Sequence, residues 1–398
     1  MVRRNFTDYR ALQQNRKEND MTTKLFRNCF LLLALALHSP VVSWGQPRSA
    51  TPKWLLAYYL CLDNSLSPAA DEILSALEGG IISKDLMVLL QVDTQESSKL
   101  ARVTLGLKQS QVYREARELG SDESAEILEF TGFLDWIIKI GNAENYVLVL
   151  VSPPGKLGQI CLDKTSGKWL SMEQVGAAVA AANEKLKSKL RLLFLHQSGT
   201  AAIENLFSFA GTSEYILASP LALRLPGTYY SELLRTMAMR PELSGRDVAS
   251  AIMESDQGYG VYTLVDSAAL KALPEKIGPV VDGLLQNSNP IAVHALFKVF
   301  SSENESYYDL QSFLDSLTPK DKPELIKAKN SFEQWYRSKL IAHKAGGPFR
   351  KAKDARYSGL SVFVPQTPDL IGPYKSLPFY GKSKFAELVA LASQPPID

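Results

Sequence analysis

The side chains that could do chemistry in this chain stand directly after two apolar runs. Leu190–Leu195 is followed by His196 and Ser198, and Tyr146–Val151 is followed by a serine and two prolines. Imidazole is the commonest general base in enzymes, and a hydroxyl becomes a nucleophile once a base takes its proton, so this pair has the residue types that acyl transfer requires. The segment carries neither an acidic residue to orient the imidazole nor the Gly-x-Ser-x-Gly pattern of a nucleophile elbow.

Two interpretations of His196 and Ser198 stay open. Residues two apart in an extended segment point to the same face, so the two side chains could meet as a serine-hydrolase pair, with an acid supplied from elsewhere in the fold. The favoured interpretation is that both are polar residues at the start of a loop. Ser198 would then cap a helix that begins near Ala201.

Apolar runs alternate with helical periodicities from Trp54 to Asp256 and predict the elements that hold these residues. Strands are expected at Trp54–Leu62, Leu86–Val92, Leu100–Leu107, Tyr146–Val151, Leu190–Leu195 and Glu214–Ala218. Helices are expected at Pro68–Leu77, Phe130–Ile140, after a Ser171/Gln174 capping box, at Tyr230–Met239 and at Ser244–Asp256. The alternation predicts a mostly parallel sheet covered on both faces, with ligands at the carboxyl ends of its strands.

The remaining segments are assigned by the same patterns. Gln111–Leu119 is charged and expected at the surface, and Lys156–Leu170 carries the turn residues of a hairpin. Helical periodicity is present in three later segments, Asp266–Gln286, Pro290–Phe300 and Glu324–Ala342. A late strand is expected at Gly359–Val364. A core of residues 47–265 is therefore expected, followed by an α-rich region, 266–398, with one late strand.

Residues 1–46 are expected to be a leader. Met21 opens a second start, with basic residues, then the nine-residue apolar run Cys29–Leu37 and small residues up to Gly45. This order is typical of a secretory signal peptide, and it predicts an exported protein that is periplasmic, associated with the cell envelope or secreted. The run is shorter than the roughly 20 residues of a spanning helix, so no transmembrane span is expected after cleavage, an uncleaved anchor being the alternative.

The charge balance excludes one large class of partner. The chain has 44 Lys and Arg against 42 Asp and Glu, and removing residues 1–46 changes the formal net charge from +2 to −2. No nucleic-acid partner is therefore expected. Cys61 and Cys161, the two cysteines outside the leader, lie in or near apolar runs and are interpreted as buried thiols rather than a metal pair or a disulfide.

No metal site and no cofactor are expected. Asp63 and Asp93 stand at strand ends, where capping is the favoured role and calcium or substrate binding the alternative. His294 and His343 lie on or at the end of helical patterns and are interpreted as structural. The histidines and cysteines lack the spacing of zinc ligands, and the glycines form no phosphate-binding pattern.

Several short motifs occur together in a familiar order. They are LCLDNSL at Leu60–Leu66, YVLVL at Tyr146–Leu150, a glutamate, Glu204, six residues after Ser198, Ala218-Ser219 with Pro226-Gly227 and Tyr230, and GLS at Gly359–Ser361. In order and spacing they resemble the clostripain family of cysteine peptidases, in the caspase-like clan, over about Trp54 to Leu388. The resemblance implies a caspase-like α/β/α sandwich with a mostly parallel sheet and an α-rich carboxyl-terminal extension.

The resemblance also implies where a catalytic dyad should lie, and there the chain departs from the family. Pro153 occupies the position of the histidine, and Ser198 occupies that of the cysteine. Proline cannot carry a proton, and a serine hydroxyl without a base is a poor nucleophile. His196 replaces an acid, and no Asp or Glu lies between Ser219 and Tyr230, where the family partly builds its specificity for basic residues.

These features favour an exported, clostripain-like protein that lacks peptidase activity and binds a peptide or protein partner. The partner would use the inherited cleft, for which Asp63, Asp93, Tyr229 and Tyr230 are the candidate residues. Two other hypotheses stay open. One is an active peptidase that uses Ser198 or a displaced nucleophile, and the other is a structural component of the cell envelope.

Overall fold

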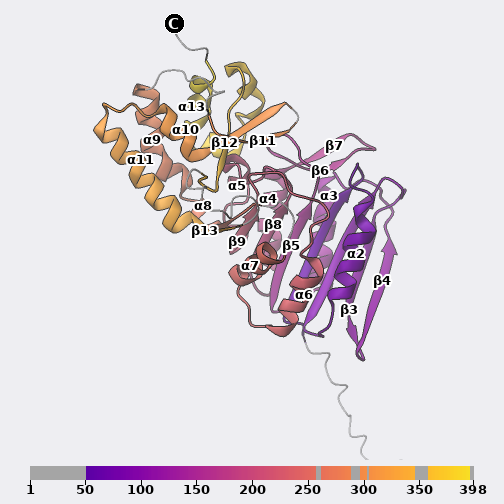
Figure 1. Cartoon of the computed structure of the whole chain (residues 1–398). Helices are drawn as coiled ribbons and strands as arrows, with labels where there is room; N and C mark the ends of the chain where they lie inside the picture. Colours follow the sequence, from indigo (N-terminus) through magenta and orange to yellow (C-terminus); the bar gives the residue numbers. More distant parts are fainter. Residues whose placement is uncertain (1–50, 257–260, 288–295, 303, 346–356, 395–398) are drawn as a thin grey trace, which may run out of the picture. The chain divides into compact units, whose positions relative to one another are not determined.

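A nine-stranded sheet forms the centre of the fold (Figure 1). The computed structural model describes residues 51–256, 261–287, 296–302, 304–345 and 357–394. The predicted signal peptide and His294 lie outside these residues. Of the helices that are described, none is both long and apolar enough to cross a membrane.

The sheet combines a parallel centre with antiparallel edges. Its strands, in spatial order, are β13 (Ile341–Ala345), β10 (Tyr262–Asp266), β9 (Tyr215–Ala218), β8 (Leu190–His196), β5 (Asn145–Val151), β1 (Trp54–Leu62), β2 (Leu86–Thr94), β3 (Ala101–Lys108) and β4 (Gln111–Glu118). The strands from β9 to β2 run parallel, and two strands at each edge are antiparallel to their inner neighbours. The predicted mostly parallel central sheet is confirmed.

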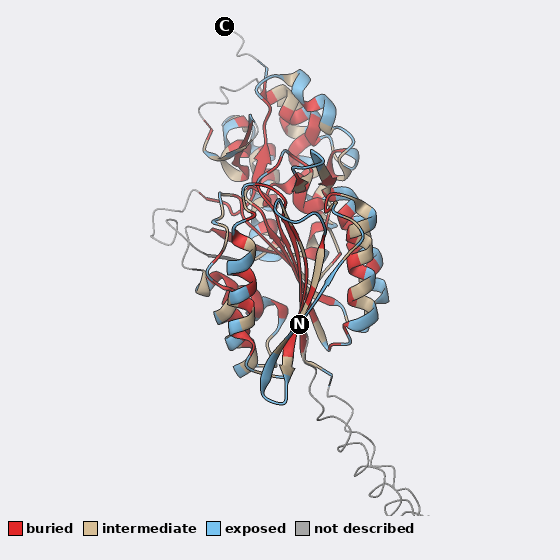
Figure 2. Ribbon diagram, turned by 90° about the vertical axis from the view of Figure 1, so that its right-hand side faces the viewer, coloured by how far each residue is buried: buried red, intermediate tan, exposed pale blue. Residues whose placement is uncertain are grey.

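Helices cover both faces of this sheet, and the buried layer lies between them (Figure 2). One face carries α2 (Ala69–Gly80), α6 (Tyr230–Met239) and α7 (Gly245–Ser255), and the other carries α3 (Ile127–Ile140) and α4 (Met172–Lys185). Successive strand residues point to opposite faces, so Leu56 and Tyr58 join the first core while Leu55 and Ala57 join the second. The central strands must therefore be apolar on both sides, which gives them the continuous apolar runs seen in the sequence.

The remaining described elements lie between the sheet strands or in the carboxyl-terminal region. They are β6 (Gln159–Asp163), β7 (Lys168–Ser171), α5 (Ile203–Phe207), α8 (Ser267–Leu270), α9 (Leu273–Asn287), β11 (Lys298–Ser302), β12 (Glu305–Asp309), α10 (Leu310–Leu317), α11 (Pro323–Trp335), a π-helical turn (Tyr336–Leu340), β14 (Ser361–Phe363), a 3-10 segment (Pro368–Tyr374), α12 (Pro378–Gly381) and α13 (Phe385–Ala392). β6 and β7 form the predicted hairpin, and β11, β12 and β14 form a second antiparallel sheet.

The charged segment Gln111–Leu119 lies at the surface as predicted, and most of it forms the exposed edge strand β4. Three local predictions differ from the structure. Lys298–Ser302 is a strand rather than the end of a helix, and Ile341–Ala345 leaves the predicted long helix to pair with β10. Ser171 precedes α4 but makes no capping hydrogen bond with its side chain. Such short segments take their structure from long-range pairing, which local periodicity does not record.

Cys61 and Cys161 form a disulfide, so the prediction of two buried thiols is wrong. Cys61 lies near the end of β1 and Cys161 in β6, at a sequence separation of 100 residues. The sequence pattern predicts the burial of each cysteine but gives no signal for their pairing, because the contact is brought about by the fold. The bridge ties the β6–β7 hairpin to β1.

Replacing both Cys61 and Cys161 by serine is expected to lower the free energy of unfolding by about 2–5 kcal/mol, because the bridge restricts a long loop of the unfolded chain. Urea unfolding followed by circular dichroism under non-reducing conditions measures the change. Dithiothreitol should lower the midpoint of the wild type and leave that of the double variant unaltered. Equal midpoints for the two untreated proteins would contradict the prediction.

Candidate functional site

The carboxyl ends of β5 and β8 bring together the two loops that carry Pro153 and Ser198. The strands are parallel neighbours, and their last paired residues are Val151 and His196. Pro153 and Ser198 each lie two residues beyond that pair. A hydrogen bond from the Ser152 N–H to the His196 carbonyl, at 3.4 Å, joins the two loops at their start. Both positions therefore begin at the same edge of the sheet.

The loop after β5 is held by backbone contacts and offers no base. Pro153 is buried, and the Ser152 hydroxyl accepts a hydrogen bond from the Cys161 N–H at 2.8 Å while donating to the Pro153 carbonyl at 3.1 Å. Of residues 152–158, only Lys156 is ionisable. This loop supplies no imidazole or carboxylate that could accept a proton from a nucleophile.

Ser198 is half-buried, and its hydroxyl takes part in holding a turn. Its Oγ accepts a hydrogen bond from the Leu223 N–H at 2.9 Å. The helix that follows, α5, has Ala202 at its N-cap, so Ser198 does not cap it as the sequence suggested. Within the described residues, no imidazole or carboxylate is hydrogen-bonded to Ser198 Oγ. The hydroxyl therefore lacks the base that activation would need.

The His196 imidazole lies in the core instead of reaching Ser198. It is fully buried, its ring stacks on Phe194 with 4.7 Å between centroids, and its Nδ1 is 3.3 Å from the Tyr229 hydroxyl. Its Nε2 has no hydrogen-bond partner. Burial lowers the pKa of His196 to about 4. The ring is thus neutral at neutral pH and a weak base, far from the pKa near 7 that suits proton transfer.

Tyr229 and Tyr230, the candidate groove residues, are also part of the core. Their exposed fractions are 0% and 1%, and their ring centroids are 4.3 Å apart. They pack with Tyr58 and with the His196 ring at the start of α6. In this structure they fill the space between α6 and the sheet and are not accessible to a ligand.

Asp63 and Asp93 come together with Asp163, a third carboxylate that is not among the site residues predicted from the sequence. One carboxylate oxygen from each lies within 4.8 Å of the other two, and all three residues are buried. The sequence does contain a signal for this meeting, because the triplet Cys-Leu-Asp occurs at Cys61–Asp63 and again at Cys161–Asp163. The disulfide joins the two cysteines and so brings the aspartates that follow them together.

Two buried glutamates fasten the second sheet to the strand ends. Glu204 accepts hydrogen bonds from the Phe363 N–H at 3.2 Å and the Tyr380 hydroxyl at 3.0 Å, and burial raises its pKa to about 7. Glu305 accepts from the Leu157 N–H at 2.7 Å and the Tyr307 hydroxyl at 2.8 Å. Through these hydrogen bonds the two acids hold the surrounding loops in place.

An open pocket lies beside the loop that follows Pro153. Its volume is about 330 Å³. Lys156, Glu305 and Gln366 contribute polar groups, and the apolar part of the wall is formed by Phe363, Val364, Pro365, Leu370, Pro373 and Tyr374. An apolar wall with a few polar groups is the usual character of a ligand pocket, and the volume suits one or two side chains of a peptide.

The fold matches that of known peptidases. An inactive zymogen of a C11 protease from Parabacteroides distasonis superposes with a TM-score of 0.66 and 20% sequence identity, over 83% of this chain and 98% of that chain. A secreted C11 cysteine protease from Bacteroides thetaiotaomicron, solved with an irreversible peptide inhibitor, gives a TM-score of 0.65 and 14% identity, over 84% and 99% of the two chains.

Comparisons of sequence alone add no relative, because no protein-family model and no curated protein matches the chain. At identities of this size, the similarity to the solved structures establishes the architecture and leaves the activity to be argued from the site. The chain has the caspase-like fold of the C11 cysteine proteases, as the sequence predicted.

Replacing His196 by glutamine is expected to make the protein less sensitive to acid. The folded-state pKa lies below the ordinary value of 6.5, so the wild type is fully stabilised above that value and loses stability as the pH falls toward 4. At about pH 4.5 the loss should amount to roughly 2–3 kcal/mol more in the wild type than in His196→Gln. Urea unfolding at neutral and acidic pH measures the difference.

The matched control for this titration is His343→Gln, which changes an exposed histidine on β13. It should lose as much stability in acid as the wild type does, since it leaves the buried His196 in place. The assignment fails if His196→Gln and the wild type lose equal stability between the two pH values.

Proposed function

We propose that the protein is an exported, clostripain-like protein without peptidase activity that binds a peptide or protein partner at the edge of the sheet carrying Pro153 and Ser198. The observation that carries this proposal is the environment of Ser198. Its Oγ accepts a hydrogen bond from the Leu223 N–H, while the imidazole two residues earlier is buried against Phe194 and Tyr229.

Peptide hydrolysis needs a proton acceptor for the nucleophile and a proton donor for the leaving amine. Pro153 can be neither, and the low pKa of His196 makes it a weak base that is fully buried. Each missing acid–base group costs roughly a factor of 10² to 10⁴, and groups that act as a unit fail together. These features support a protein that hydrolyses peptides at a rate close to that of the uncatalysed reaction in water.

A protein that has lost its catalytic groups can still bind a peptide, because a pocket needs shape and a few polar groups but no nucleophile. The pocket at Lys156 and Tyr374 meets these requirements, and Lys156 lies three residues after Pro153. A peptide placed there would lie beside the loop from β5. This proximity supports a partner site derived from a substrate site.

Export is supported by two independent features. The leader-like residues before Gly45 have the order of a signal peptide. The disulfide between Cys61 and Cys161 is a bond that persists in oxidising compartments and is rare in the cytosol. Together they favour a periplasmic, envelope-associated or secreted location.

The purified protein and its Ser198→Ala variant are expected to show the same background hydrolysis of fluorogenic peptides ending in arginine or lysine, because the hydroxyl has no base. A continuous fluorescence assay measures both rates. Ser97→Ala, a change at an exposed serine, reports contaminating peptidases, which would act in all three preparations. Wild-type activity that only Ser198→Ala abolishes would establish a serine hydrolase and refute the proposal.

Changing Leu370 to glutamate is expected to weaken peptide binding at least tenfold, or about 1.4 kcal/mol, because a charge enters the apolar wall of the pocket. The probe is a fluorescent peptide selected on the wild-type protein from a displayed random library, with affinity read by anisotropy. Leu370 is 48% exposed, so the change does not disturb the core.

The control is Leu128→Glu, the same change at a leucine of α3 that is 79% exposed and outside the pocket. It should bind the selected peptide like the wild type. If both variants bind as the wild type does, or both lose binding equally, the pocket is not the binding site.

A further inference from the structure

The pocket beside the loop that follows β5 carries one acidic and one basic side chain, and only the acid is already matched by partners. Glu305 is the first residue of β12 and has an exposed fraction of 7%. Its Oε2 accepts hydrogen bonds from the Leu157 N–H at 2.7 Å and the Tyr307 hydroxyl at 2.8 Å, and its Oε1 accepts one from the Tyr374 hydroxyl. Three donors therefore stabilise this carboxylate before any ligand arrives.

The two tyrosines keep the protons that they donate to Glu305. Burial raises the pKa of Tyr307 and that of Tyr374, and the neighbouring Glu305 carboxylate adds to both effects. A carboxylate has about four lone-pair positions, and three of those on Glu305 are occupied. A cationic group of a ligand would have to compete with these donors for the same two oxygens.

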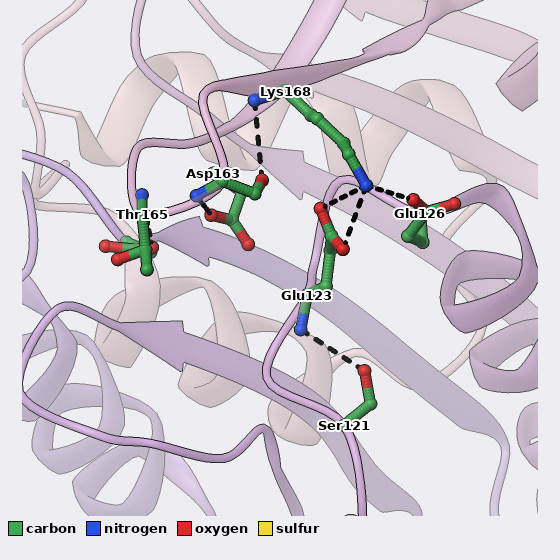
Figure 3. A network of polar contacts seen from close by, with 8 residues as sticks. Ser121, Glu123, Glu126, Asp163, Thr165 and Lys168 are labelled. Carbon is green, nitrogen blue, oxygen red and sulfur yellow. Dashed lines mark hydrogen bonds and ion pairs between the residues drawn. The ribbon is translucent and has the colours of Figure 1, made fainter.

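The ammonium group of Lys156 is the charge in this pocket that still lacks a partner. Its side chain is exposed, and none of the ion pairs formed among the described residues involves it. The contrast is Lys168 at the start of β7, which is bound by Glu123 at 2.9 Å and Glu126 at 2.5 Å (Figure 3). Of the described residues that line the pocket, Lys156 is the one base.

Hydrogen bonds of the backbone fix the point from which the Lys156 side chain extends. The Lys156 N–H donates to Gln159 Oε1 at 3.1 Å, and the Gln159 N–H donates back to the Lys156 carbonyl at 3.0 Å. The N–H of the next residue, Leu157, is the one that donates to Glu305. The base is thus anchored at the rim beside the acid, and little conformational freedom of the backbone is lost when a ligand binds.

The rest of the wall suits an apolar group. The Phe363 and Tyr374 rings meet edge to face with 5.2 Å between their centroids, and Leu370 is 48% exposed. All three line the pocket, whose volume of about 330 Å³ is sufficient for a large side chain. Covering the exposed leucine removes apolar surface from water and favours binding.

We infer that this pocket binds the carboxyl-terminal residue of a peptide, with the free carboxylate on Lys156 and a large apolar side chain against Phe363, Leu370 and Tyr374. Side chains of neighbouring residues in an extended peptide point to opposite sides, so an acidic and an apolar side chain in sequence do not enter one pocket together. A terminal residue carries its carboxylate and its side chain on the same Cα. Capture of a terminal carboxylate is an established mode of peptide recognition.

This inference rests on the proposed peptide-binding function and assigns the end of the peptide that enters the pocket. The probes are fluorescein-labelled pools of random pentapeptides ending in leucine, made once with a free carboxylate and once as the amide. Anisotropy with the full-length protein at low ionic strength should give about fivefold tighter binding of the free-carboxylate pool. The preference reflects a charge-assisted hydrogen bond at a partly exposed site, and added NaCl should reduce it.

Two further pools identify the chemistry that the pocket selects. Pentapeptide amides ending in glutamate carry the negative charge on a side chain, and pentapeptides ending in lysine with a free carboxylate replace the apolar group by a cation. Both should bind more weakly than the pool that ends in leucine with a free carboxylate. In the first the carboxylate and the apolar group are not on one residue, and in the second the cation meets an apolar wall and an acid that is already matched.

Lys156→Met should lower the affinity for the free-carboxylate leucine pool about fivefold, to that of the amide pool, because the positive charge is removed while much of the side chain's length is kept. The matched control is Lys164→Met, the same change at an exposed lysine that does not line the pocket. It should keep the preference for the free carboxylate in full.

The inference is overturned if the wild type binds the two leucine pools equally or binds neither, or if Lys156→Met keeps the preference. It is also overturned if the pool ending in glutamate or in lysine binds as tightly as the free-carboxylate leucine pool. In each case the proposed function still stands if the peptide selected from the displayed library binds and loses affinity in Leu370→Glu. The absence of any such selected peptide contradicts the proposed function itself.

Discussion

Burial of both faces of the parallel strands is the constraint on which the rest of this structure depends. β1, β5 and β8 each separate two cores, so their register fixes which side chains meet α2, α6 and α7 and which meet α3 and α4. A shift by one residue would exchange the two sets, so that side chains whose shapes fit one core would enter the other. The same register sets where along the strand direction each loop begins at the carboxyl edge, and therefore which residues can share a site.

This constraint explains why the sequence predicts the central strands so well and the periphery less well. Trp54–Leu62 is apolar on both faces and is a strand over the range expected. β4 and β13 at the two edges take their structure from a neighbouring strand, and no local periodicity marks them. The disulfide and Asp163 escaped prediction for the same reason, because their partners lie far away in the sequence.

The candidate site was predictable in position but not in the direction of its side chains. Strand ends alone place Pro153 and Ser198 at one edge, since β5 and β8 are parallel neighbours. Whether His196 turns toward Ser198 depends on strand alternation, which puts it on the same face as Phe194 and so in the core. The polar groups that remain at the edge hold turns: Thr200 donates to the Gln197 carbonyl at 3.0 Å, as Ser198 accepts from Leu223. Both hydroxyls are therefore engaged with the local backbone in this structure.

The outermost strand, β4, has a consequence for how the molecule behaves among copies of itself. Nearly all of its residues are exposed, and arginines alternate with glutamates along it. An incoming chain could pair with its free backbone groups only by stripping water from charges of both signs. Growth of the sheet into fibrils at this end is thereby discouraged.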